Sequence, residues 1–328
     1  MGWWQVDADT LAGGRFVVSP LSEAISSLKL LQLHAPAAHP GDRAWLDAHL
    51  PAFRRKVAED PLLPLLLKCA FRPTWNADFI TPTPVGDAKQ DFAQELERVR
   101  AASADSVLCD LAVALGGPPP AELLRTDLAE RAAALLDWVW RETVLPEWPR
   151  RRRVLEADIV SRTAQLSRGG WATALGGMRP GMRWLGGDRL QINTQDNPPR
   201  EVAGAQLLFV PVSFATSWVS WEGRRRFAVV YPCAGALAEL GCGRASAPEA
   251  LAALLGPARA GILVLLGSPK STTQLVALTG LALGSVGRHL KVLLDARLVR
   301  RMRAGRSVLY YRTEPGDGLV HAQDRAQT

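Results

Sequence analysis

Two short helical patterns followed by a basic hairpin pattern, all in the last fifth of the chain, constrain the fold most strongly. The first pattern begins at Ser271 or Thr272, where Gln274 has the spacing of a capping box, and it ends at Gly280. A short glycine-bearing turn leads into the second pattern, over residues 285–297. Two helices joined in this way are typical of a helix-turn-helix, and a short apolar helix precedes them.

The helix over residues 285–297 is predicted to have one apolar and one cationic face. At about 100° per residue, its apolar side holds Val286, Leu290, Leu293 and Leu294. The opposite side holds Gly284, Arg288, Lys291 and Asp295. The helix can therefore bury its leucines while it presents cations outward.

The residues after this helix mix apolar and basic side chains in two strand-like runs on either side of Ala304 and Gly305. The arginines expected to be exposed there are Arg300, Arg301, Arg303, Arg306 and Arg312. A basic hairpin placed directly after a helix-turn-helix describes a winged helix. In that arrangement the last helix enters the major groove of DNA, and the hairpin, or wing, lies along the phosphates or the minor groove.

The net charge of +7 belongs entirely to this part of the chain. Residues 257–328 hold 11 of the 39 Lys and Arg residues and 4 of the 32 Asp and Glu residues, which leaves 28 of each kind in residues 1–256. Such an asymmetry indicates a polyanion-binding module attached to a neutral partner domain.

These patterns predict a DNA-binding surface. Its candidate residues are Thr272, Thr273, Ser285, Arg288, His289, Lys291, Arg301, Arg303 and Arg306. Ser285 and Arg288 are expected to contact bases, and the wing arginines to grip phosphates. His289 falls at the edge of the apolar face, so it is expected to pack or to touch a phosphate rather than to read a base.

The neutral remainder is predicted to be mainly helical up to residue 180. Ser19 and Pro20 give a strong helix start, and further helical patterns cover residues 43–58, 60–71, 87–102, 104–115 and 121–144. After residue 180, short β-branched and aromatic runs predict a small antiparallel sheet with a hairpin at Glu222 and Gly223.

The chain of 328 residues is long enough for two or three domains, and its class is predicted to be α+β. The expected division is a helical sensing and dimerisation domain (residues 1–180), a β-rich segment packed on it (181–245), a winged helix (250–315) and a flexible tail (316–328).

The eleven tryptophans all lie in the neutral part, the last being Trp221. They suggest an apolar pocket for a small-molecule effector, although core packing explains the same residues. The candidate ligand-binding residues are Trp75, Trp138, Trp140, Trp171 and Trp218. Trp138 and Trp140 are two positions apart, so they cannot share one face of a helix.

Four consecutive arginines, residues 150–153, allow two interpretations. They form either a phosphate-binding cluster or a solvated helix start whose charges are met by Glu156 and Asp158. The second interpretation is favoured because the domain is otherwise neutral.

No metal or cofactor is expected. The cysteines Cys69, Cys109, Cys233 and Cys242 form no C-x-x-C pair, which fits reduced thiols in the cytoplasm. The spacing of His34, His39 and His49 matches no metal-ligand pattern. The sequence shows no signal peptide and no apolar run approaching the roughly 20 residues that span a bilayer.

The segment STTQLVALTGLALGSVGRHLKVLLDARLVRRMRAGRSVLYYRT resembles the winged-helix domain of the ArsR-type bacterial transcriptional regulators. The resemblance covers about residues 255–315 and implies a homodimeric regulator, expected to be a repressor, on a double-stranded DNA operator with two-fold symmetry. It does not imply metal sensing, because the metal-sensing members carry cysteines in the helix-turn-helix or the terminal helices, and no cysteine follows Cys242. The stretches RFVVSPLSEAISSLKLL and YPCAGALAEL resemble a long N-terminal extension found on some of these regulators, for which no ligand is implied.

Three departures from the family pattern support an alternative hypothesis. Gly287 stands where Ser is common, Ala282 where a polar N-cap is usual, and Arg297 where the family has Gly. The alternative is a regulator impaired in DNA binding that acts through protein contacts. A third hypothesis, an enzyme with an appended DNA-binding domain, finds no support, because the sequence lacks nucleophile-elbow, phosphate-loop, dinucleotide and zinc-protease motifs.

Overall fold

The structure is a computed structural model of the chain that describes residues 2–33, 40–86, 91–176, 178–195, 197–233, 248–267, 270–304 and 307–321. Contacts divide these residues into two compact units. Of the described residues, the N-terminal unit comprises those up to 33, 43–149 and 175–233, and the C-terminal unit comprises those within 40–42, 150–174 and 248–321.

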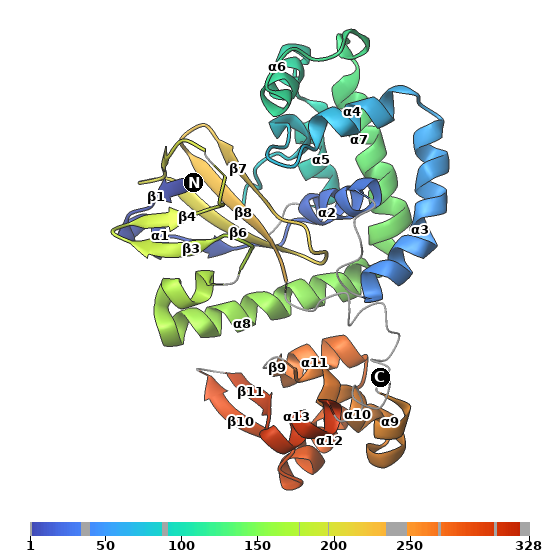
Figure 1. Cartoon of the computed structure of the whole chain (residues 1–328), viewed down its shortest axis with the longest axis vertical. Helices are drawn as coiled ribbons and strands as arrows, with labels where there is room; N and C mark the ends of the chain where they lie inside the picture. The colour runs from blue at the N-terminus through green and yellow to red at the C-terminus, as the bar shows by residue number, and fades with distance from the viewer. Residues whose placement is uncertain are drawn as a thin grey trace. The chain divides into compact units, whose positions relative to one another are not determined.

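The N-terminal unit combines helices with two small sheets (Figure 1). Its helices are α1 (Ala8–Ala12), α2 (Pro20–Leu33), α3 (Pro40–Ala58), α4 (Leu62–Ala70), α5 (Phe92–Arg100), α6 (Ala104–Leu115) and α7 (Leu128–Val139), with short turns η1 (Asp78–Ile80), η2 (Ala121–Leu123), η3 (Trp140–Val144) and η4 (Leu145–Glu147). Its strands are β1 (Trp3–Gln5), β2 (Arg15–Phe16), β3 (Arg183–Gly186), β4 (Arg189–Gln191), β5 (Arg200–Glu201), β6 (Gln206–Val212), β7 (Trp218–Glu222) and β8 (Arg226–Pro232).

The two sheets are mixed, which differs from the antiparallel sheet that the sequence predicts. The strand orders are β3-β4-β1-β5 and β2-β6-β8-β7, and the pairs β1–β5, β2–β6 and β6–β8 are parallel. The predicted hairpin is present, since β7 and β8 pair antiparallel around Gly223. Strands β6 and β8 are buried almost throughout, as is typical of strands covered on both faces, and such continuous apolar runs do not reveal their neighbours.

The β-rich segment lies in one unit with the helices, on which it was expected to pack, and the N-terminal strands β1 and β2 enter the two sheets. The α+β class itself agrees with the prediction. Conversely, contacts group residues 150–174 of α8 (Trp148–Leu175) with the C-terminal unit. Gly170 has a φ of +67° and breaks the regular backbone of α8.

Helix α2 is the central element of the N-terminal unit, and it contacts α5, α7 and β6 (Figure 1). Every residue from Ser19 to Leu31 is buried, on the polar side of the helix as well as on the apolar side. Ser19 is the N-cap, because its Oγ accepts a hydrogen bond from the N–H of Ser22 at 3.0 Å. The carboxylate of Glu95, from α5, accepts further hydrogen bonds from Ser19 Oγ (2.9 Å) and from the N–H of Leu21 (2.8 Å).

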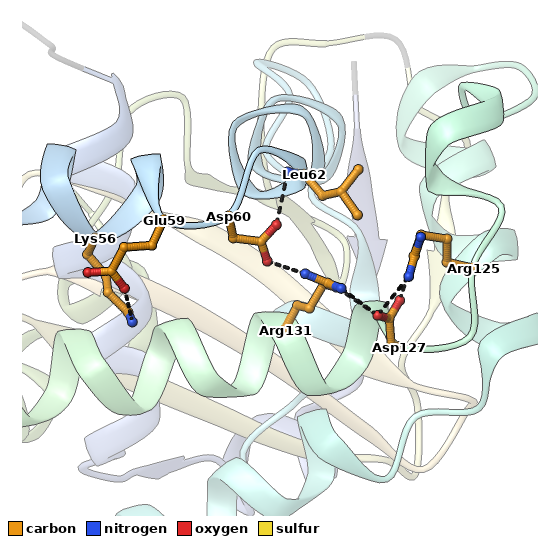
Figure 2. A network of polar contacts seen from close by, with 7 residues as sticks. All are labelled: Lys56, Glu59, Asp60, Leu62, Arg125, Asp127 and Arg131. Atoms are coloured by element: carbon orange, nitrogen blue, oxygen red, sulfur yellow. Dashed lines mark hydrogen bonds and ion pairs between the residues drawn. The ribbon is translucent and has the colours of Figure 1, made fainter.

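A network of ion pairs joins the starts of α4 and α7 at the surface of the same unit (Figure 2). Arg131 contacts both Asp60 and Asp127, and Asp60 accepts a hydrogen bond from the N–H of Leu62 at 3.0 Å. Hydrogen bonds from Arg125 and Arg131 hold the pKa of Asp127 well below its usual range. Because these groups are partly exposed, the network orients the helix ends more than it stabilises the fold.

The C-terminal unit contains, besides α8, the helices α9 (Glu249–Leu255), α10 (Pro257–Leu265), α11 (Thr272–Thr279), α12 (Leu283–Asp295) and α13 (Glu314–His321). Its sheet has the order β10-β11-β9, from β9 (Lys270–Ser271), β10 (Val299–Ala304) and β11 (Ser307–Arg312). This is the predicted succession of helix, helix-turn-helix and hairpin.

Helix α13 replaces the predicted flexible tail over residues 316–321, whereas residues 322–328 of that tail lie outside the described part of the chain. Leu319 and Val320 pack against the cluster around Leu251 and Ala260, which joins α13 to α9 and α10. Gly316 permits this close packing, because a Cβ there would lie 2.2 Å from the carbonyl oxygen of Leu298. The sequence does not predict this helix, because its eight residues include a proline and two glycines, which are the weakest helix formers.

We expect Glu95→Gln to change how the stability of the N-terminal unit depends on pH. Burial raises the pKa of Glu95 to about 7, against the hydrogen bonds from Leu21 and Ser19, which lower it. A carboxyl group whose pKa is raised in the folded state loses its stabilising effect as the pH rises from its unfolded pKa, near 4.5, through 7. The amide cannot ionise, so between pH 4.5 and pH 7 the free energy of unfolding of the variant should rise by about 3 kcal/mol relative to that of the wild type.

Chemical denaturation followed by tryptophan fluorescence, from pH 5 to pH 8, measures this difference. Other groups titrate equally in both proteins, so their contributions cancel. Parallel stability curves for the two proteins would show that Glu95 does not carry the raised pKa.

Candidate nucleic-acid interface

Helix α11 begins with the capping box that the sequence predicts. Ser271 Oγ accepts a hydrogen bond from the N–H of Gln274 at 3.2 Å, and Gln274 Oε1 accepts one from the N–H of Ser271 at 2.6 Å. The Gln274 amide also donates to the carbonyl oxygen of Ala157, in α8, at 2.8 Å. Gly280 ends the helix in the left-handed region, with a φ of +67°, and so opens the turn that leads into α12.

Helix α12 has the predicted two faces. Val286, Leu290 and Leu293 are at most 1% exposed. The residues that face outward include Gly284, Gly287, Arg288, Lys291 and Asp295, all of them exposed. Two apolar side chains share the exposed surface, since Leu283 is 62% and Val292 44% exposed.

Both ends of α12 depart from ideal helix ends. Ala282 is the N-cap and supplies no side-chain hydrogen bond to the first turn. At the other end Arg297 has a φ of +57°, in the left-handed region that favours glycine. The N–H of Leu298 donates to the carbonyl oxygen of Leu293 at 3.0 Å, so Arg297 occupies the position where a helix commonly ends on glycine.

The wing consists of β10 and β11 in antiparallel register from Val299↔Arg312 to Ala304↔Ser307. Arg300 and Arg301 are exposed, and the guanidinium of Arg300 lies 5.3 Å from the centre of the Tyr311 ring. Arg312 differs from our expectation of an exposed residue: its side chain is 11% exposed and pairs with Asp317 at 2.7 Å. It fastens β11 to α13 and is not available to DNA.

The predicted DNA-binding residues that the structure describes lie on α11, α12 and the wing. Thr272 and Ser285 are half-buried, whereas Arg288, Lys291 and Arg301 are exposed. His289 is half-buried at the edge of the apolar face, with its Nε2 3.3 Å from Ser285 Oγ, so these two side chains are held together. Arg306 and the side chains of Thr273 and Arg303 lie outside the part of the chain that the structure describes.

The four arginines at the start of α8 do not form one kind of site. Arg152 is exposed and pairs with Glu156 at 2.8 Å, as the solvated interpretation predicts. Asp158 lies 3.5 Å from Arg162. Arg151 is fully buried, which neither interpretation anticipated.

The five candidate tryptophans do not meet in one place. Trp75 and Trp218 line a single pocket in the N-terminal unit, together with Trp3, Trp4 and Trp221, which are not among the five candidates. Trp140 is in the core, stacked on Phe92 with ring centres 4.5 Å apart, whereas Trp138 lines a different pocket and Trp171 lies on α8. The predicted separation of Trp138 from Trp140 is thus present, and of the five candidates Trp75 and Trp218 share this pocket.

Within the described residues no group of His, Cys, Asp and Glu has the arrangement of a metal site. The described helices include none that is long and apolar enough to cross a membrane.

Residues 256–301 match the family model described as bacterial regulatory protein, arsR family. This part of the chain, from the residue before α10 into β10, is therefore an ArsR-type helix-turn-helix domain, the module of DNA-binding transcriptional regulators. The N-terminal unit lies outside the matched residues. Comparison with curated proteins and with solved structures gives no match.

Replacing Arg297 by glycine should stabilise the C-terminal unit by about 1 kcal/mol, because glycine adopts a positive φ without the clash of a Cβ. Arg297→Ala is the matched control: it removes the same exposed side chain but keeps the Cβ. Calorimetric melting of the full chain should show a higher transition temperature for the glycine variant than for the alanine variant. Equal transition temperatures would mean that the backbone at this position carries no strain.

Proposed function

We propose that the protein is a cytoplasmic, homodimeric transcriptional repressor whose C-terminal unit binds a DNA operator and whose N-terminal unit senses a small molecule. The observation that carries the DNA-binding half is the exposed cationic face of α12. Arg288 and Lys291 point away from the leucines that fix the helix in its domain. A helix held in this way can enter the major groove, where an arginine binds the O6 and N7 atoms of guanine.

The distribution of charge supports the same half of the proposal. The excess of +7 lies in residues 257–328, and among the described wing residues Arg300 and Arg301 extend the cationic surface beyond α12. Arginines on a hairpin contact phosphates without reading sequence, so they position the helix rather than select the operator. Base recognition falls to Arg288 and Ser285, near the start of α12.

The homodimer and the sensing role have separate support. An operator with two-fold symmetry requires two copies of a single helix-turn-helix, spaced by about one turn of DNA. The N-terminal unit holds a pocket lined with tryptophan and cationic side chains, which is the kind of site that an effector needs.

A second candidate function is a regulator that acts through protein contacts, with weakened DNA binding. Two exposed apolar side chains favour it: Val292 places apolar surface beside Arg288 on the cationic face, and Leu283 does so at the start of α12. The uncapped start at Ala282 and the positive φ of Arg297 weaken the ends of the same helix. Measured DNA affinity separates the two candidates.

Substitutions on α12 and on the wing should weaken DNA binding in different ways. Arg288→Ala should weaken the free energy of operator binding by about 1–3 kcal/mol, because it removes a base contact. It should also relax the sequence preference at one position of the operator. Arg301→Ala should weaken binding to all sequences because it removes a phosphate contact. The slope of log K against log salt concentration should become shallower by about one unit. Lys291→Ala should weaken operator binding, and the predicted wing residues Arg303 and Arg306 should behave like Arg301.

Gel shifts on an operator selected from genomic DNA, at several salt concentrations, measure both effects. Arg225→Ala, an exposed arginine in the N-terminal unit, is the control and should bind as the wild type does. The complex should contain two chains on one operator. If Arg288→Ala and Arg301→Ala bound like the wild type at moderate salt, the roles given to α12 and the wing would be wrong and the second candidate would be preferred.

A further inference from the structure

One pocket of the N-terminal unit combines buried cations with aromatic walls. Its volume is about 140 Å³, and it lies among β1, the end of α2, the segment after α4, and β7. Four basic side chains line it, namely Lys29, Arg72, Arg179 and Arg200. Asp78 is the one carboxylate among the lining residues described. The pocket therefore carries an excess of positive charge.

Lys29 is buried and Arg179 is half-buried, and neither has a carboxylate partner among the described residues. The Nζ of Lys29 donates to Asn76 Oδ1 at 2.8 Å and lies 5.6 Å from the centre of the Trp218 ring. The Nε and Nη1 atoms of Arg179 are buried, and no described residue accepts a hydrogen bond from them. A buried charge is stable when it is paired, so this pair of cations favours a bound anion.

The electrostatics of the two groups agree with this geometry. Burial, and after it the positive charge of Arg179, lowers the pKa of Lys29 to about 8. Burial alone lowers the pKa of Arg179 to about 10. An anion bound between the two groups would raise both pKa values, because a negative charge favours their protonated forms.

The fourth cation and the carboxylate have a different role. The guanidinium of Arg200 lies 3.7 Å from the centre of the Trp221 ring. Its positive charge lowers the pKa of Asp78, against the burial that raises it. Arg200 therefore has both an aromatic and an acidic neighbour, and the uncompensated charge stays at Lys29 and Arg179. Arg72 is exposed at the same pocket and adds charge on its solvent side.

The walls and the size of the pocket define the rest of the ligand. Trp75 and Trp221 meet edge to face with ring centres 5.4 Å apart, and Trp218 is 5% exposed. A cavity of about 150 Å³ accommodates a benzene ring. Guanidinium groups bind planar carboxylates through two parallel hydrogen bonds.

From this geometry we infer that the pocket binds a small carboxylic acid with one ring, whose carboxylate pairs with Arg179 and Lys29 and whose ring lies against the tryptophans. The binding itself is independent of the proposed DNA-binding function. Its role as the effector site of the repressor rests on that function.

Isothermal titration of the full chain, without DNA, tests the ligand class. Benzoate and phenylacetate are the probes, benzyl alcohol has the ring without the charge, and inorganic phosphate has the charge without the ring. At least one carboxylate should bind, and both controls should bind at least roughly tenfold more weakly. Binding of phosphate or benzyl alcohol as tight as that of the carboxylates, or no binding of either carboxylate, would overturn the inference.

The variants Arg179→Met and Lys29→Met test the residues. Each should weaken carboxylate binding by roughly tenfold to a hundredfold, because a charge-assisted hydrogen bond is lost. Arg179→Met should also melt at a higher temperature than the wild type in the absence of ligand, since it removes a half-buried charge whose Nε and Nη1 have no partner among the described residues. A cooperative melt at that temperature shows that the variant folds. Arg225→Met, which removes an exposed arginine outside the pocket, should change neither quantity. Unchanged carboxylate affinity in both pocket variants would overturn the assignment.

The two proposals fail separately. Loss of carboxylate binding would leave the gel shifts on α12 and wing variants unaffected. Failure of those gel shifts would leave the titrations in the absence of DNA unaffected.

Discussion

The polar face of α2 is the constraint on which the N-terminal unit depends. A helix buried on all sides must find partners inside the protein for every polar group that it carries, since an unpaired buried group costs about 1–3 kcal/mol. The partners come from separate parts of the unit: Glu95 of α5 meets the start of the helix, the N–H of Ser213 donates to Glu23 at 2.8 Å, and Thr216 contacts Ser26 at 2.6 Å. One buried helix thereby ties the helical elements to the connection between β6 and β7.

The same helix explains why a cationic pocket exists. Lys29 lies on its polar face, where it meets Asn76 and the Trp218 ring, and strand β7 supplies both Trp218 and Trp221. The contacts that hold α2 in place therefore also fix one cation against the rings of Phe71 and Trp218. Arg179, which follows α8, adds the second cation.

The sequence predicts the C-terminal unit well and the N-terminal unit only in part, and the reason is the range of the interactions. The capping box at Ser271, the faces of α12 and the hairpin after it all depend on residues a few positions apart, so local patterns reveal them. The parallel pairing of β6 with β8 depends on contacts that no local pattern encodes. Likewise, Trp75 and Trp218 share a pocket although they are far apart in the chain, and Arg151 is buried although its neighbours suggest a solvated helix start.

A ligand in the pocket can change DNA affinity only to the extent that it binds the DNA-bound and the DNA-free protein differently. Tight binding alone is therefore not regulation: in the proposed site, Lys29 and Arg179 account for the affinity for the acid but not for the coupling. The coupling is reciprocal: an acid that weakens operator binding by a given factor must itself bind more weakly, by the same factor, to the protein on DNA. In the proposed regulator, the α12 face therefore sets the affinity for the operator and the pocket sets the affinity for the acid, while the change in operator affinity depends on how differently the two states of the protein bind the acid.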